Sequence, residues 1–181
     1  MAEKLFIRRY SRKLIYIYIR ELLFYQDVYI VFDRYRKLSV KSSTHTQRAK
    51  NLAYRYQLTL QTPLPDKEKV LSCSGNKVHL IDIICKYVSQ KVATDNLTHL
   101  LVVTGSNDVP MQISNGVMSQ KHEYRTTHEE ADVIIVQQCY RLINNEGCNA
   151  VKIISDDTDV FSLACYFYPV ERTDVTVFIK V

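Results

Sequence analysis

Four short runs of apolar, mostly β-branched residues place the strongest constraint on the fold of this chain. The runs occupy residues 28–32, 100–103, 151–154 and 175–179. The runs at residues 28–32 and 100–103 are continuously apolar, which is typical of a strand that is covered on both faces of a parallel sheet. Segments with helical spacing separate the runs, at residues 44–59, 78–92, 127–142 and 160–167. This alternation predicts an α/β fold in which a mainly parallel central sheet is flanked by helices in three α/β/α layers.

The chain is long enough for one substantial hydrophobic core. It has 181 residues, of which 46% are hydrophobic, and we expect a single domain overall. Residues 1–27 form a basic, aromatic segment that we predict to be helical over residues 4–25. The α/β domain is then expected to occupy residues 28–181.

Two features predict an intracellular protein, nuclear or cytoplasmic, rather than a secreted one. Its five cysteines are scattered, with no C-x-x-C pair, which favours free thiols in a reducing compartment. The apolar stretch at residues 14–32 contains Arg20, Glu21 and Asp27, so it is a poor membrane span and a poor cleavable signal. We therefore expect no membrane partner. The sequence also lacks the glycine-rich motifs of small-molecule cofactor sites.

Acidic residues concentrate at two predicted helix starts. Asp156, Asp157 and Asp159 follow the run at residues 151–154, while Glu129, Glu130 and Asp132 lie in the first turn of a helix expected to begin near Thr127 or His128. Carboxylates at helix N-termini often serve only as caps, and Thr127 with Glu130 fits a capping box. One cap needs one acid, however, and carboxylates that crowd together are commonly held by a hard cation. The two clusters together favour a site for Mg²⁺ or Mn²⁺.

Basic residues concentrate in a different part of the chain. Residues 34–65 contain no acid, within a chain of net charge +5, and they include three tyrosines. Basic groups neutralise phosphates and aromatic rings stack on bases, so the stretch predicts a nucleic-acid-binding surface. The alternative is a solvated helix face. The candidate nucleic-acid-binding residues are Arg34, Arg36, Lys37, Lys41, Arg48, Lys50 and Arg55.

The order of these motifs resembles the PIN-like nuclease domain of the flap endonuclease family. In that family an apolar strand ends in Phe-Asp, a helix starts with Glu-Ala-Glu-Ala, and an acidic Asp-x-Asp turn follows the next strand. Here the matching positions are Phe32-Asp33, Glu130-Ala-Asp132 and Asp156-Asp157-Thr-Asp159. The match extends in order over residues 28–166.

The resemblance implies a metal-dependent phosphodiester hydrolase that acts on nucleic acid, with DNA expected rather than RNA. One or two Mg²⁺ or Mn²⁺ ions would be held by Asp33, Glu130, Asp132, Asp157 and Asp159. Lys41 and Arg48 would be the catalytic basic pair that grips the scissile phosphate. Asp156 would then be a cap or an outer residue of the site.

The chain departs from the family at both ends. No strand with an aspartate precedes residue 28, and no helix-hairpin-helix element follows the last match, so we expect a divergent or truncated relative. This leaves a catalytically inactive PIN-like binding or scaffold module, possibly from a mobile element, as the alternative function. A Toprim-like fold is a third hypothesis, and it predicts that Asp33 lies far from Asp157.

Overall fold

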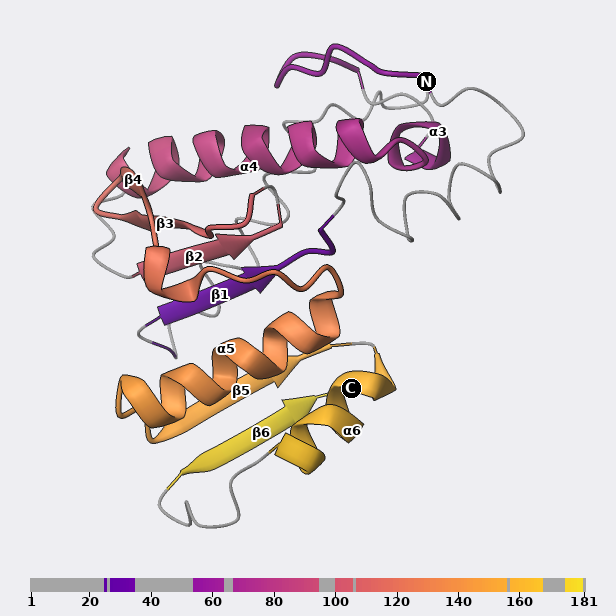
Figure 1. The fold of residues 1–181 in the computed structure, drawn as a ribbon. Coiled ribbons are helices and arrows are strands. Elements are labelled where there is room, and N and C mark those ends of the chain that lie inside the picture. The colour runs from indigo at the N-terminus through magenta and orange to yellow at the C-terminus, as the bar shows by residue number, and fades with distance from the viewer. Residues whose placement is uncertain are drawn as a thin grey trace. The chain divides into compact units, whose positions relative to one another are not determined.

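A computed structural model describes the chain as two compact units (Figure 1). Unit 1 comprises Met1–Ile30 and Tyr35–Arg125, and unit 2 comprises Val31–Arg34 and Thr126–Val181. The helix predicted over residues 4–25 and most of the basic stretch lie outside the described residues. The described residues are 25, 27–34, 54–63, 67–94, 100–105, 107–155, 157–167 and 175–180.

A four-stranded sheet begins with β1 (Asp27–Val31), which runs from unit 1 into unit 2, and continues within unit 1 through β2 (Leu100–Thr104), β3 (Met111–Ser114) and β4 (Val117–Gln120). The strands follow one another in that order across the sheet. β2 pairs with β3 antiparallel, and β3 pairs with β4 antiparallel. The α/β class is therefore confirmed, but this sheet is mostly antiparallel, in contrast to the mainly parallel sheet that we expected.

The β3–β4 hairpin is the element responsible for that difference, and the sequence contains a signal for it. Ser114 pairs with Val117, which leaves the two-residue loop Asn115-Gly116. Both loop residues have positive φ, 51° for Asn115 and 74° for Gly116. Asn-Gly is the preferred pair for a tight hairpin turn of this kind. The alternation of apolar and polar residues before it, at Met111–Ser114, was the local evidence for a strand entering this turn.

Unit 1 also contains the helices α3 (Lys67–Leu71) and α4 (Ser74–Thr94) and the short 3-10 helix η1 (His122–Tyr124). α4 includes the predicted helix at residues 78–92 and buries Leu80, Ile81 and Ile84, at helical spacing. In contrast, residues 54–59 are not helical, so the predicted helix at residues 44–59 is wrong over the part that is described. Within the described ranges, α4 and the other helices are all too short or too polar to cross a membrane.

Unit 2 contains α5 (Ala131–Asn145), β5 (Ala150–Ile154), α6 (Thr158–Phe167) and β6 (Thr176–Lys180). β5 and β6 pair in parallel, with Val151 opposite Val177 and Ile153 opposite Ile179. Both helices pack on these side chains. Their shared core consists of Ile143, Val151, Ile153, Val160 and Val175. The parallel pairing and the helix–strand alternation expected for this part of the chain are confirmed.

The cysteines differ strongly in their environment, which predicts their reactivity. Burial raises the pKa of Cys85 to about 12, with a further contribution from the charge of Asp82. Burial likewise raises the pKa of Cys139 to about 12, with a smaller contribution from nearby Cys148. Cys165 is exposed on α6. Because the thiolate is the reactive form, we expect Cys165 to react with Ellman's reagent at about pH 8, whereas Cys85 and Cys139 react only after unfolding.

The same shifts predict how stability changes with pH. The thiols of buried Cys85 and partly buried Cys139 keep their protons in the folded state up to a pH of about 12, but in the unfolded chain they ionise near pH 9.0. Stability from these groups is therefore complete below pH 9.0 and is lost as the pH rises toward 12. If Cys85 in the folded protein were labelled as fast as Cys165, the reactivity predicted from burial would be contradicted.

Candidate metal centre

A hydrogen bond between Asp33 and the start of α5 connects two of the predicted acidic motifs. The Ala131 N–H, at the first residue of α5, donates to Asp33 Oδ1 at 3.0 Å. A helix leaves its first N–H groups without acceptors in its own backbone, so a carboxylate from elsewhere in the chain can satisfy one of them. Asp33 and the acidic start of α5 belong to unit 2. The bond therefore brings Asp33 to the helix that carries Glu130 and Asp132.

α5 begins later than its sequence suggests. We expected a start near Thr127 or His128 with a capping box, but the helix begins at Ala131, and the N-cap residue Glu130 makes no capping bond with its side chain. The acceptor comes instead from Asp33, which no local pattern could reveal. Asp132 lies in the first turn, where its Oδ1 accepts a bond from the Val133 N–H at 2.8 Å.

Arg34 holds the segment that leads into α5. Its Nη1 donates to the carbonyl oxygens of Thr126 at 2.6 Å and His128 at 2.8 Å. The backbone N–H of Arg34 also donates to the Glu129 carbonyl at 2.8 Å. Only 3% of Arg34 is exposed. The structure thus gives Arg34 a role inside unit 2 instead of the nucleic-acid contact that we expected.

We predict that Arg34→Leu loosens the start of α5. The Thr126 carbonyl is in a buried residue, and a buried acceptor without its donor costs about 1–3 kcal/mol. Hydrogen exchange of the α5 amides should therefore become faster, by the factor that this loss of free energy sets. Arg55→Leu is the matched control, since Arg55 is exposed in unit 1. Unchanged exchange in α5 of the Arg34 variant would contradict the prediction.

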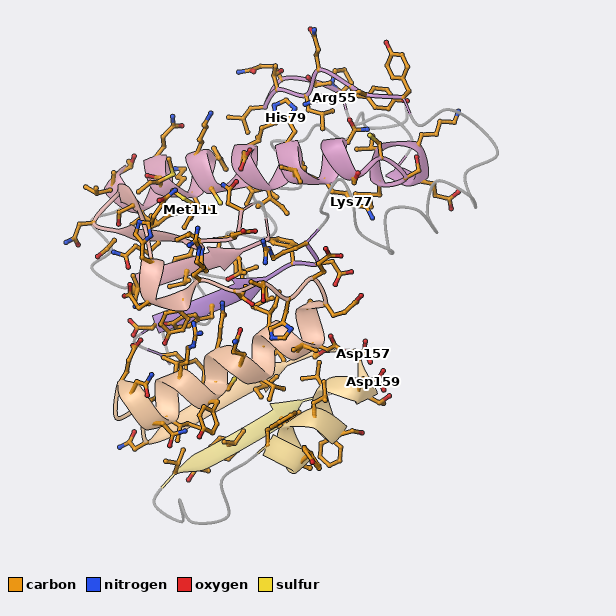
Figure 2. All side chains as sticks on the ribbon, in the orientation of Figure 1. Arg55, Lys77, His79, Met111, Asp157 and Asp159 are labelled. Carbon is orange, nitrogen blue, oxygen red and sulfur yellow. The ribbon has the colours of Figure 1, made fainter. Side chains whose placement is uncertain are left out.

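The second acidic cluster lies at the start of α6. The Asp159 N–H donates to Asp157 Oδ1 at 3.0 Å, and the Asp157 N–H donates to Ser155 Oγ at 3.1 Å. Asp157 is thus the side-chain cap of α6, and Asp156 lies outside the described residues. Figure 2 shows Asp157 and Asp159 together at this helix start. Within unit 2, β5 ends and α5 begins at this same end (Figure 1).

The carboxylates of unit 2 are the right type of ligand for a hard cation, but their described positions do not form a complete site. Carboxylate oxygens are the ligands that Mg²⁺ and Mn²⁺ prefer. Among the residues that the structure describes, however, no group of three or more Asp, Glu, His or Cys is placed to hold an ion. In this arrangement Asp33 and Asp157 act as helix caps.

Most of the predicted basic surface lies outside the described residues. This applies to both members of the predicted catalytic pair and to three further candidates, namely Lys41, Arg48, Arg36, Lys37 and Lys50. Of the remaining two, Arg34 is buried and Arg55 is exposed. The roles of the five undescribed residues stay predictions.

Similarity to other proteins does not assign this chain to a family. Comparison with family models, with curated proteins and with solved structures finds no match. The placement of the acidic residues in unit 2 is therefore the basis for a functional proposal.

Proposed function

We propose that this chain is a divalent-metal-dependent phosphodiester hydrolase of the PIN-like type that acts on nucleic acid. The observation that carries the proposal is the bond from Ala131 to Asp33 Oδ1. It unites the strand-ending aspartate with the acidic start of α5, two motifs that the family resemblance pairs. The parallel β5–β6 pair, with α5 and α6 packed against it, also supports an α/β arrangement of this type within unit 2.

The third motif has a compatible position. Asp157 and Asp159 begin α6 directly after β5, and the start of α5 lies at the same end of unit 2 (Figure 1). In α/β folds, ligands bind at the carboxyl ends of strands, where helix starts gather. This end of unit 2 also gathers more carboxylates than its two helices need as caps.

Each predicted residue has a part in the proposed chemistry. The carboxylates of Asp33, Glu130, Asp132, Asp157 and Asp159 would hold Mg²⁺ or Mn²⁺. When bound, such an ion polarises a phosphodiester and lowers the pKa of an attacking water. Lys41 and Arg48 would neutralise negative charge on the phosphate oxygens.

A cleavage assay tests the proposal. Labelled single-stranded, flapped and duplex DNA, with matched RNA, would be incubated with the protein in Mn²⁺, in Mg²⁺ or in excess EDTA. We expect hydrolysis of at least one substrate with metal and none with EDTA. Metal-independent hydrolysis, or none on any substrate, would reject the proposal.

A second function is a nucleic-acid-binding module without catalysis. It is favoured by the capping bonds of Asp33 and Asp157 and by the lack of a three-ligand group among the described residues. It predicts binding that weakens steeply with salt and no hydrolysis. Charge reversal at Lys41 and Arg48 should then weaken binding, and unchanged binding would mean that these two residues belong to a solvated face.

A further inference from the structure

An aromatic pair with one exposed ring lies in unit 1, apart from the acidic motifs of unit 2. Tyr54 and Tyr56 are in edge-to-face contact, with ring centroids 4.9 Å apart and an interplanar angle of 70°. Tyr54 is 69% exposed, so most of its ring faces solvent rather than the core. Arg55, between them, is also exposed. We call residues 54–56 the tyrosine platform.

The backbone of the tyrosine platform is held by hydrogen bonds, although the side chains of Tyr54 and Arg55 are exposed. Asn76, which is fully buried, donates from Nδ2 to the Tyr54 carbonyl at 2.9 Å and accepts at Oδ1 from the Tyr56 N–H at 3.0 Å. The same Nδ2 donates to the Val70 carbonyl at 3.1 Å. One buried amide therefore ties residues 54–56 to both α3 and α4. The platform is ordered before any partner arrives, so binding to it would cost little conformational entropy.

The guanidinium of Arg55 lies next to the start of α4, on the side of the helix that carries His79. A side chain added at Gly75, in the first turn of α4, would lie 3.8 Å from Arg55 Nε, so the guanidinium lies beside this turn. His79 is one turn further along, on the same helix face as Gly75. Figure 2 shows Arg55 and His79 on one side of α4 and Lys77 on another.

We propose that the tyrosine platform binds unpaired bases of single-stranded nucleic acid, with Arg55 contacting the neighbouring phosphate. Tyrosine rings stack on any base, and a guanidinium beside them supplies the charge that phosphates require. The described stretch around the platform, residues 54–63, contains Arg55 and no acidic residue, so a negatively charged partner fits it better than a basic one. The inference rests on the proposed function at one point only, where it takes the bound single-stranded nucleic acid to be the substrate. The binding itself needs no metal.

The test is fluorescence anisotropy of a labelled oligothymidine with the full chain in EDTA, where no metal-dependent cleavage occurs. We expect Tyr54→Ala to weaken binding at least about five-fold, the lower end of the effect of removing one base–aromatic stack. Tyr54→Trp keeps a stacking ring and should bind like the unaltered chain. Arg55→Gln should lower the dependence of binding on salt. A duplex of the same sequence, without unpaired bases, should bind more weakly.

Tyr140→Ala is the matched control, because Tyr140 is 50% exposed but lies on α5 in unit 2. It should bind oligothymidine normally. Equal binding by Tyr54→Ala and the unaltered chain, or no binding by the unaltered chain, would overturn the platform. A different result would reject the proposed function alone. In that case the platform variants would weaken binding as expected, but no substrate would be hydrolysed when Mn²⁺ replaces EDTA.

Discussion

Asp157→Asn should abolish metal-dependent hydrolysis while leaving the fold of unit 2 intact. Asparagine caps a helix as well as aspartate does, so its amide oxygen can keep the bond from the Asp159 N–H. What the variant loses is a negative charge and a strong cation ligand. Because even outer-shell partners of a catalytic metal typically contribute 10–100-fold, we expect the rate to fall at least about 100-fold.

Two comparisons make this result specific. Glu146→Gln removes a carboxylate from the opposite end of α5, at its C-cap, and should cleave normally. Circular dichroism and hydrogen exchange of α6 should be unchanged in Asp157→Asn, which separates loss of the ligand from loss of the cap. Cleavage that survives Asp157→Asn would show that this turn is only a helix start.

Gly116→Ala should be among the most destabilising single substitutions in unit 1. Gly116 has φ of 74°, a conformation that costs alanine about 1–2 kcal/mol. A Cβ there would also lie 2.3 Å from Ala93 Cβ and 2.8 Å from Ala93 Cα, so the hairpin tip or the end of α4 must move. Overpacking of this kind costs about 1–3 kcal/mol, which gives roughly 2–5 kcal/mol together.

Movement of the tip would also disturb the bond that Ser89 Oγ donates to the Gly116 carbonyl at 2.6 Å. Urea unfolding, with hydrogen exchange of the β3 and β4 amides, measures the loss. Gly147→Ala is the control, since Gly147 has φ of 66° but a Cβ there would meet nothing within 4 Å. It should cost only the strain of about 1–2 kcal/mol. Equal losses in the two variants would show that the Ala93 contact is unimportant.

The parts of the fold that were predictable have their evidence in local sequence. The apolar runs that became β5 and β6 and the helical spacing of α6 each depend on neighbours only a few residues away. Local periodicity also identified α4, although it missed the first turn at Ser74. Such elements bury one continuous face, so the pattern of apolar residues suffices to locate them.

The parts that were not predictable depend on contacts between distant residues. The start of α5 is set by Asp33 and Arg34, more than ninety positions away in the chain. Residues 54–56 follow the hydrogen bonds of Asn76 instead of continuing the expected helix. Arg34 is part of a basic run in the sequence, and its neighbours there gave no sign that its side chain would be buried and bonded to two carbonyl oxygens.

Titration with Mn²⁺ tests most directly whether the carboxylates of unit 2 form one cation site. A bound Mn²⁺ broadens the NMR signals of nearby amides, so the amides of Ala131 and Asp159 report on the two helix starts separately. We predict that both signals broaden together and saturably, and that both effects disappear in a chain carrying Asp33→Asn and Asp157→Asn. If either signal stays sharp, or if the broadening persists in the double variant, a shared metal site is contradicted.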